Sequence, residues 1–244
     1  MSSYYIGLSL LSNMGRNSAS PREILHTEGR RVLSLLDGRP EGELEKIMAK
    51  DPSGRPFFTD RQHLADFSIS HSGNMVAVSF VNRGQTQGNN LPFVDLRTGC
   101  DIELVKPRVN ARGIAEEFFT EPEVGYIFAH SEGPDSENSC SIERFFQIWT
   151  LKECFLKLRG YSVFDMAKAP SFIGADGGLH LEFPGPLKFH FFSLSSSAER
   201  YVLASAVEGP LQASIRWFSP PLALRNMAAI KAETSPDDTV MAKM

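Results

Sequence analysis

One segment of this sequence reads Trp149-Thr150-Leu151-Lys152-Glu153-Cys154-Phe155-Leu156-Lys157. It contains neither Gly nor Pro and lies in a mostly apolar run, so we expect a long helix over residues 142–159. Side chains four residues apart share one helix face, which places Trp149, Glu153 and Lys157 in a row. A lone carboxylate among apolar neighbours is costly to bury unless it is paired or bound to a metal. The segment therefore predicts a helix that presents a functional carboxylate and a lysine on one face.

A second segment, Gly99-Cys100-Asp101-Ile102-Glu103, has the alternation of a strand. Side chains two residues apart on a strand point to the same side, so Asp101 and Glu103 face one way. If this strand meets the helix, three carboxylates and Lys157 converge. Carboxylates are hard oxygen ligands that suit Mg²⁺ or Mn²⁺. We therefore predict a divalent-cation site of Asp101, Glu103 and Glu153, facing an anionic substrate.

Composition narrows the class of protein. The 244 residues are 42% hydrophobic and 22% charged, which is typical of a globular protein, and the formal net charge is −4. This acidic balance gives no support for a nucleic-acid partner. Three cysteines, an odd number, argue against a disulfide framework and favour a reduced, cytoplasmic protein. No apolar run approaches the ~18 residues of a spanning helix, so we expect no membrane partner.

The expected elements fall into two similar groups. The first comprises a strand at 4–11, a helix at 21–36 capped by Ser20, a helix near 41–50, and strands at 67–70 and 75–81. The second comprises a strand at 92–104, a helix from 114, the helix at 142–159, and strands near 187–192 and 201–207. This order predicts an α+β fold with halves at 1–94 and 95–220, and a tail at 221–244 that we expect to be partly disordered.

Short blocks along the chain carry a family resemblance. Two are the acidic strand and the long helix, which read Gly-x-Asp-x-Glu and Trp-x-x-Lys-Glu-x-x-x-Lys. Three more are Gly54-Arg55-Pro56, Phe67-Ser68-Ile69-Ser70-His71-Ser72-Gly73 and Glu117-Phe118-Phe119-Thr120-Glu121-Pro122-Glu123. In this order and spacing the chain resembles the 4′-phosphopantetheinyl transferase superfamily, specifically the larger surfactin-synthetase (Sfp) type.

The resemblance implies a fold, a reaction and partners. The fold is a pseudo-dimer of two similar halves, each a helix packed on a small antiparallel sheet. The active site lies between the halves, with coenzyme A contacts in the N-terminal half, and a monomer supplies the whole site. The implied enzyme, a holo-[acyl-carrier-protein] synthase, transfers the 4′-phosphopantetheine of coenzyme A to a serine of an apo acyl or peptidyl carrier protein. The other product is 3′,5′-ADP, and the metal cofactor is Mg²⁺, with Mn²⁺ as the alternative.

The resemblance also implies roles for individual residues. Asp101, Glu103 and Glu153 would hold the metal, and Glu153 would also take the serine proton, directly or through water. Lys157, the second catalytic residue, would contact the pyrophosphate oxygens or stabilise the departing phosphate. The remaining coenzyme A contacts would come from Arg55 at the adenine and 3′-phosphate, Ser70, His71 at the phosphates, and Lys152 at a phosphate.

Other interpretations stay open at this stage. The three carboxylates also suit a metal-dependent phosphohydrolase, and an inactive relative would only bind coenzyme A or a carrier. Lys152 is equally consistent with a solvated helix residue, and Lys157 with a surface lysine paired to Glu153. Arg30 and Arg31 are candidates for the 3′-phosphate, although exposed helix arginines are usually just solvated.

Overall fold

The structure is a computed structural model that describes residues 3–11, 20–60, 65–82, 96–107, 110–129, 139–195, 199–209, 215–218 and 231–234. Its elements form two groups in chain order. The first group is β1 (Ser3–Leu10), α1 (Pro21–Asp37), α2 (Glu41–Ile47), β2 (Met48–Lys50), β3 (Pro56–Phe58), β4 (Ala65–Ser72) and β5 (Met75–Asn82). The second is β6 (Arg97–Leu104), α3 (Ala111–Phe118), α4 (Glu121–Phe128), α5 (Ser139–Arg159), the 3₁₀-helix η1 (Val163–Lys168), β7 (Leu187–Ser195) and β8 (Arg200–Glu208).

Each group builds one main sheet with the same internal order, and β2 and β3 form a separate antiparallel pair. In the first sheet β4 pairs with β5 and β5 with β1, and in the second β7 pairs with β8 and β8 with β6. All four pairings are antiparallel. The predicted α+β fold is confirmed, and the order of strand, helix and hairpin recurs in both halves.

Two short strands cross the predicted boundaries. β9 (Ile215–Phe218) lies parallel to β1 in the first sheet, although we expected residues 95–220 to belong to the C-terminal half. β10 (Lys231–Thr234) pairs with β7 and lies within the segment 221–244 that we predicted to be a partly disordered tail. Both strands give partners to backbone groups that a sheet edge would otherwise leave unpaired. A four-residue strand is too short for its sequence to show a clear alternation of apolar and polar residues.

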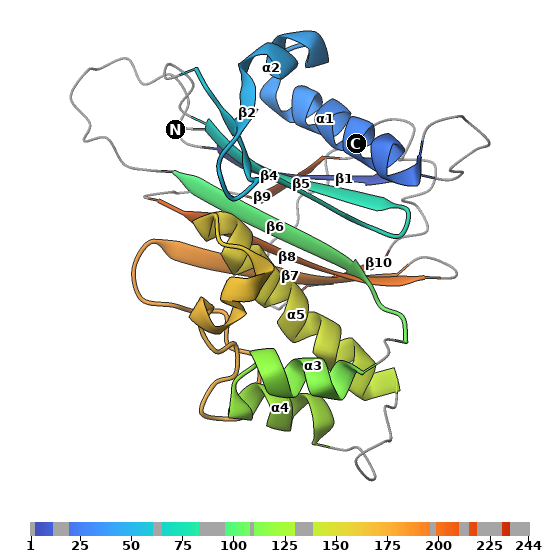
Figure 1. The fold of residues 1–244 in the computed structure, drawn as a ribbon, viewed down its shortest axis with the longest axis vertical. Helices are drawn as coiled ribbons and strands as arrows, with labels where there is room; N and C mark the ends of the chain where they lie inside the picture. The colour runs from blue at the N-terminus through green and yellow to red at the C-terminus, as the bar shows by residue number, and fades with distance from the viewer. Residues whose placement is uncertain are drawn as a thin grey trace.

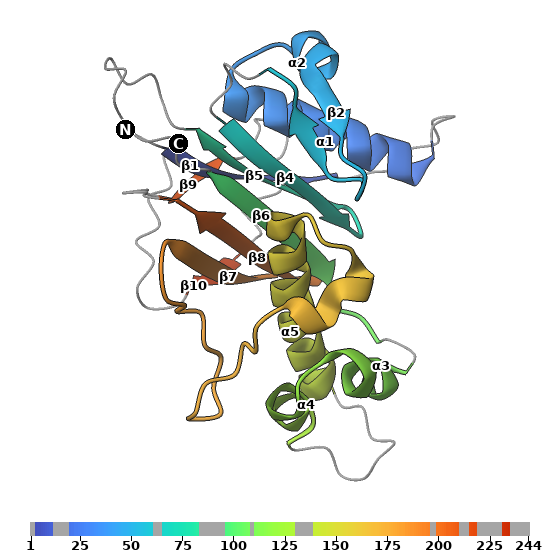
Figure 2. The same ribbon diagram turned by 60° about the vertical axis from the view of Figure 1, so that its left-hand side comes forward.

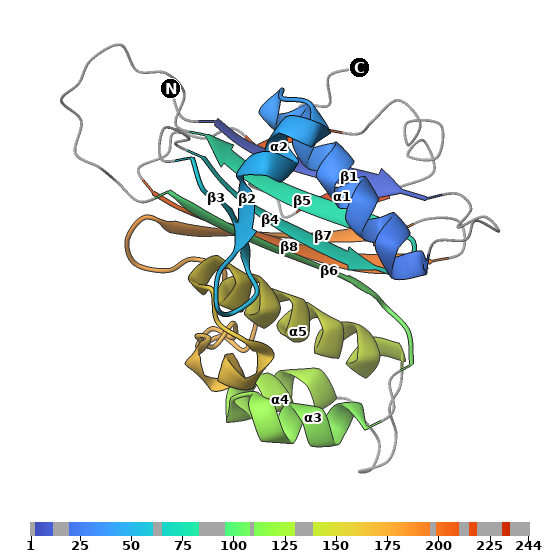
Figure 3. The same ribbon diagram turned by 45° about the horizontal axis from the view of Figure 1, so that its top comes forward.

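Helices cover the outer faces of the two sheets, whose inner faces pack on each other (Figure 1). α1 buries Leu25, Val32 and Leu33 against β4 and β5. α5 packs on the second sheet next to β6 (Figure 2), and α3 and α4 lie beyond it (Figure 3). Within the described ranges, no helix combines the length and apolar character that crossing a membrane requires.

The start of α1 follows the expected signals. Ser20 is the N-cap, its side chain accepts a hydrogen bond from the backbone N–H of Glu23, and Pro21 occupies the first helical position. The Glu23 side chain bonds back to Ser20, which completes a capping box. This cap fixes where the helix begins, and therefore which of its side chains face β4.

Strands β4 and β6 are the edge strands of their sheets, and serine side chains join them. Ser70 and Ser72, two residues apart, share one face of β4. Each hydroxyl accepts a hydrogen bond from a backbone N–H of β6 and donates one to a β6 carboxylate. The pairs are Ser70 with Ile102 N (3.3 Å) and Asp101 (2.8 Å), and Ser72 with Leu104 N (3.0 Å) and Glu103 (2.8 Å). We call these contacts the serine seam; they align the Ser-His-Ser-Gly block with the acidic strand.

Gly99 allows α5 to approach β6 closely. A Cβ atom at this position would lie 2.4 Å from the carbonyl oxygen of Cys154 and 2.7 Å from the backbone nitrogen of Leu158. Both are backbone atoms, so no side-chain movement could relieve the collision. The glycine of the Gly-x-Asp-x-Glu block therefore brings Glu153 and Lys157 within reach of the acidic strand.

Candidate active site

A cavity of about 750 Å³ is lined by residues of both halves. Its walls come from α1, the β2–β3 connection, β4, β6 and α5. The predicted functional residues that line it are Arg55, Ser70, His71, Asp101, Glu103, Glu153 and Lys157. Blocks that are far apart in the sequence therefore meet at one place.

Trp149, Glu153 and Lys157 all line this cavity, as their helical spacing predicts. The Trp149 ring stacks on Phe145, with centroids 5.9 Å apart, and lies 6.4 Å from the ring of Phe119. These aromatic contacts anchor the α5 face that carries the carboxylate and the lysine.

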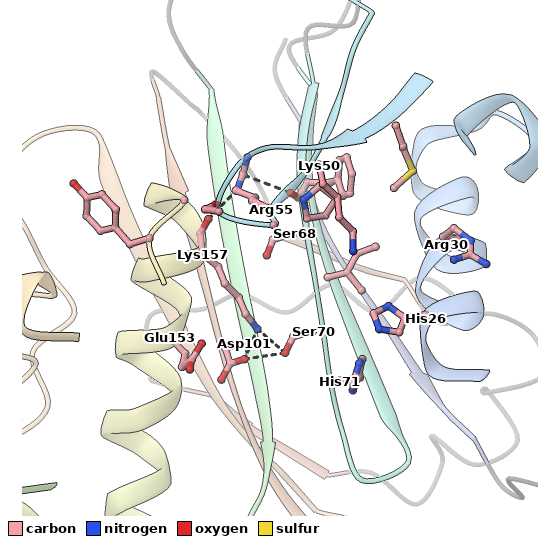
Figure 4. Close-up of a pocket in the computed structure, with 18 of the residues that line it drawn as sticks. His26, Arg30, Lys50, Arg55, Ser68, Ser70, His71, Asp101, Glu153 and Lys157 are labelled. Atoms are coloured by element: carbon pink, nitrogen blue, oxygen red, sulfur yellow. Dashed lines mark hydrogen bonds and ion pairs between the residues drawn. The ribbon is translucent and has the colours of Figure 1, made fainter. Parts of the chain in front are cut away.

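Lys157 is held in the cavity by one partner from each half. Its Nζ donates to Asp101 Oδ1 at 2.6 Å and to Ser70 Oγ at 2.9 Å (Figure 4). Burial lowers the pKa of Lys157, but the negative charges of Asp101 and Glu153 outweigh that effect and raise its pKa above the usual value. Lys157 is therefore a charged group of the cavity rather than a solvated surface lysine.

The three predicted metal ligands differ in burial. Asp101 is only 4% exposed, whereas Glu103 and Glu153 are partly buried. Asp101 Oδ2 is buried and finds no hydrogen-bond partner among the described residues. An unsatisfied buried carboxylate oxygen is costly, and a cation would satisfy it.

The oxygen donors suit a hard divalent cation in kind, but they are not gathered around one point. In the part of the chain that the structure describes, no three His, Cys, Asp or Glu side chains cluster closely enough to hold a metal ion. Metal binding by Asp101, Glu103 and Glu153 therefore stays a prediction, which the buried Asp101 oxygen favours.

Cationic and imidazole side chains line the part of the cavity next to α1 (Figure 4). We call this set the basic wall; it consists of Arg22, His26, Arg30, Lys50 and His71. The three α1 members are spaced by four residues and share one helix face. The rings of His26 and His71 meet edge to face, with centroids 5.1 Å apart. Of these five residues, the sequence analysis names only Arg30 and His71. The four-residue spacing of Arg22, His26 and Arg30 on α1 also indicates a shared basic face.

Burial and neighbouring positive charges act in the same direction on both imidazoles. For His26, burial and the charge of Arg22 lower the pKa, with smaller contributions from Lys50 and Arg30. For His71, burial lowers the pKa and the charges of His26 and Lys157 lower it further. Positive charge is therefore disfavoured at the basic wall, and a bound anion would relieve the repulsion between its cations.

Arg55 lines the cavity, but two of its nitrogens bond to the protein. Its Nε donates to the carbonyl oxygen of Lys157 at 2.9 Å. Its Nη2 donates to Asp66 Oδ2 at 2.6 Å and to the carbonyl oxygen of Thr98 at 3.1 Å. The predicted contact of Arg55 with the adenine and 3′-phosphate stays a prediction, and these bonds indicate a different role.

The prediction that Lys152 binds coenzyme A is wrong. Its side chain is fully buried and does not line the cavity; its Nζ lies 3.1 Å from Oε2 of Glu123, which is also fully buried. Glu123 additionally accepts hydrogen bonds from Thr120 N–H at 2.8 Å and Phe172 N–H at 3.1 Å. Lys152 points about 100° around the helix from Glu153, which directs it to α4 instead of the cavity. Sequence reasoning missed this ion pair because only tertiary packing brings α4 onto α5.

Residues 97–206, which run from β6 into β8, match the family model described as the 4′-phosphopantetheinyl transferase superfamily. Over these residues, the chain is similar to the 4′-phosphopantetheinyl transferase superfamily. The match contains Asp101, Glu103, Glu153 and Lys157, so the superfamily segment supplies the acidic side of the cavity.

Individual superfamily members are similar over part of the chain. The 4′-phosphopantetheinyl transferase AcpT of Escherichia coli (strain K12) is 31% identical over 152 residues, which cover 62% of this chain and 65% of that protein. AcpT of Salmonella typhi is 30% identical over 51% of this chain and 55% of its own length. The 4′-phosphopantetheinyl transferase ffp of Bacillus subtilis is 34% identical over 44% of this chain and 38% of its own length. The match thus spans less than two thirds of the length of each of these relatives.

Proposed function

We propose that this protein transfers the 4′-phosphopantetheine group of coenzyme A to a serine of an apo acyl or peptidyl carrier protein. The products are the holo carrier and 3′,5′-ADP, which makes it a holo-[acyl-carrier-protein] synthase. The observation that carries the proposal is one cavity in which Asp101, Glu153 and Lys157 share the space with the basic wall. Coenzyme A carries a pyrophosphate and a separate phosphate, so its binding requires cations along the cavity and acidic residues for a bridging metal. Similarity to the 4′-phosphopantetheinyl transferase superfamily supports transfer over hydrolysis.

The residues of the cavity suit an in-line displacement at phosphorus, which needs positioning and charge stabilisation more than covalent help. The carrier serine oxygen forms a bond to the β-phosphorus of coenzyme A, and the bond from that phosphorus to the bridging oxygen breaks. Lys157, already charged, would contact the pyrophosphate oxygens and stabilise the charge on the leaving phosphate. Glu153, one turn away on α5, would take the serine proton, directly or through water.

Asp101, Glu103 and Glu153 would hold a divalent cation, either Mg²⁺ or Mn²⁺. When bound, such an ion supplies charge neutralisation at the pyrophosphate. The buried Oδ2 of Asp101 supports this assignment because it is a carboxylate oxygen without a hydrogen-bond partner among the described residues. We also propose that a monomer is active, since residues of one chain line both sides of the cavity.

Intact-mass spectrometry of an apo acyl carrier protein tests the reaction directly. After incubation with the protein, coenzyme A and Mg²⁺, the carrier should gain the mass of one phosphopantetheine. The gain should disappear with EDTA and in Glu153→Gln. Glu143→Gln is the matched control, because Glu143 also lies on α5 but pairs with Arg200 at the surface.

Two other outcomes would replace the proposal. Tight binding of coenzyme A without any mass gain on several carriers would indicate a binding-only relative. Breakdown of coenzyme A in the absence of a carrier would indicate a phosphohydrolase.

A further inference from the structure

Arg55 connects three elements at the point where the two halves meet. It lies in the turn between β2 and β3, and its partners belong to α5 (Lys157), β4 (Asp66) and β6 (Thr98). We propose that Arg55 is a positioning residue that fixes Lys157 in the cavity, and that it is not a ligand of the coenzyme A 3′-phosphate. This inference rests on the proposed function and deepens it, because it separates the residue that aligns the site from those that bind the donor.

The first step concerns the end of α5. The last carbonyls of a helix have no partners within the helix, and positive side chains stabilise that end. The carbonyl oxygen of Lys157, in the last turn, accepts a hydrogen bond from Arg55 Nε at 2.9 Å and one from Gly160 N–H at 3.3 Å. Arg55 therefore holds the backbone of the same residue whose ammonium reaches Asp101 and Ser70.

The second step concerns Asp66, which anchors Arg55. Asp66 Oδ2 accepts Nη2 of Arg55 at 2.6 Å and the backbone N–H of Thr98 at 2.8 Å. The side chains of Arg55 and Asp66 are only 14% and 13% exposed, so solvent screens this pair weakly. The guanidinium of Arg55 is therefore poorly suited to bind a phosphate, because the phosphate would have to displace the carboxylate of Asp66.

The third step concerns the alternative phosphate ligands. Lys50, His26 and Arg30 line the cavity on the side of α1, whereas Arg55 lies at the end of α5 (Figure 4). Among the described residues, Arg30 pairs with the largely exposed Glu45 at 3.2 Å. Exposed ion pairs of this kind are weak, so Arg30 can leave Glu45 and bind a phosphate at little cost in free energy.

The experiment compares coenzyme A with 3′-dephospho-coenzyme A. Transfer kinetics with each donor, and binding of each by isothermal titration, are measured for wild type, Arg55→Ala, Arg55→Lys, Asp66→Asn, Arg30→Ala and Lys50→Ala. Arg159→Ala is the matched control: it also removes an arginine from the end of α5, one that pairs with Glu208 and does not line the cavity.

A positioning role predicts a specific pattern. Arg55→Ala should lower kcat about tenfold or more for both donors, because a displaced catalytic group slows the chemistry whichever donor is bound. The ratio of the two binding affinities should stay within about twofold of wild type, well below the tenfold change that 1.4 kcal/mol would produce. Asp66→Asn should reproduce the loss, and Arg55→Lys should not restore the rate, since an ammonium cannot span the same acceptors. Arg30→Ala or Lys50→Ala should weaken binding of coenzyme A but not of dephospho-coenzyme A.

Other results would overturn the proposal. If Arg55→Ala removes the preference for coenzyme A while Asp66→Asn leaves kcat intact, then Arg55 binds the 3′-phosphate. An unchanged kcat in Arg55→Ala would refute the positioning role as well. If Arg55→Ala does not fold, Arg55→Lys and Asp66→Asn decide the question. A wild-type protein that binds both donors without transferring from either would refute the proposed function, while the binding ratios would still test Arg55.

Discussion

Replacing Lys152 by methionine should destabilise the protein strongly, although Lys152 does not line the cavity. Lys152 and Glu123 are both fully buried, with their charged atoms 3.1 Å apart. In Lys152→Met, the Glu123 carboxylate would stay buried without its cation. Removing one partner of a buried ion pair costs about 3–5 kcal/mol. Since 1 kcal/mol lowers the melting temperature of a chain of this size by about 2–4 °C, we expect Lys152→Met to melt about 6–20 °C below wild type.

The double variant Glu123→Gln/Lys152→Met isolates the cause of that loss. It removes both charges, so no buried charge is left unpaired, and most of the stability should return. A residual loss of about 1–2 kcal/mol is expected, because Glu123 accepts hydrogen bonds through both of its oxygens and glutamine offers one.

Thermal and urea melts at pH 7, followed by circular dichroism, measure these differences. Arg200→Met is the control, because Arg200 pairs with Glu143 at the surface and its loss should change the free energy of unfolding by less than about 1 kcal/mol. The reasoning would be refuted by a Lys152→Met variant within 1 kcal/mol of wild type. A double variant as unstable as the sum of its single changes would refute it equally.

Three further predictions concern the cavity. Glu153→Gln should abolish transfer while its melting temperature stays near that of wild type; normal turnover would remove Glu153 from the chemistry. Lys157→Ala should lower kcat/KM more than tenfold, because one charge-assisted contact is worth about 1.5–3 kcal/mol, and an unchanged kcat/KM would make Lys157 dispensable. The folded protein should lose stability as the pH falls below 6.5, the usual pKa of histidine, because the pKa values of His26 and His71 are lowered and the unfolded chain binds more protons. His26→Gln/His71→Gln should flatten that slope in thermal melts at pH 5–7, and an unchanged slope would show that other groups cause it.

Features encoded by local spacing could be predicted from the sequence. The four-residue spacing on one helix placed Glu153 and Lys157 on the same face, and the alternation of the acidic strand placed Asp101 and Glu103 on one side of that strand. The helix beginning after Ser20 also followed from its capping signals. In each case the residues that determine the outcome are near neighbours in the chain.

Features that depend on distant residues were missed. Nothing near Lys152 in sequence indicates that α4 will cover it with Glu123. Lys50 joins the basic wall, and Arg55 meets Asp66, only because the β2–β3 hairpin packs beside β4. The Gly-x-Asp-x-Glu pattern suggested a ligand set, yet the further reason for its glycine is the backbone of α5, more than fifty residues away.

The serine seam has a consequence for any attempt to separate the two halves. β4 and β6 are the outermost strands of their sheets on the sides that face each other. Two backbone N–H groups of β6 donate hydrogen bonds to serine hydroxyl groups of the opposite half, and not to the backbone of a neighbouring strand. A chain cut between β5 and β6 would therefore yield fragments with bare strand edges, which recruit further strands and aggregate. The seam thus protects each half from self-association, and neither half should be obtainable as a soluble fragment without the other.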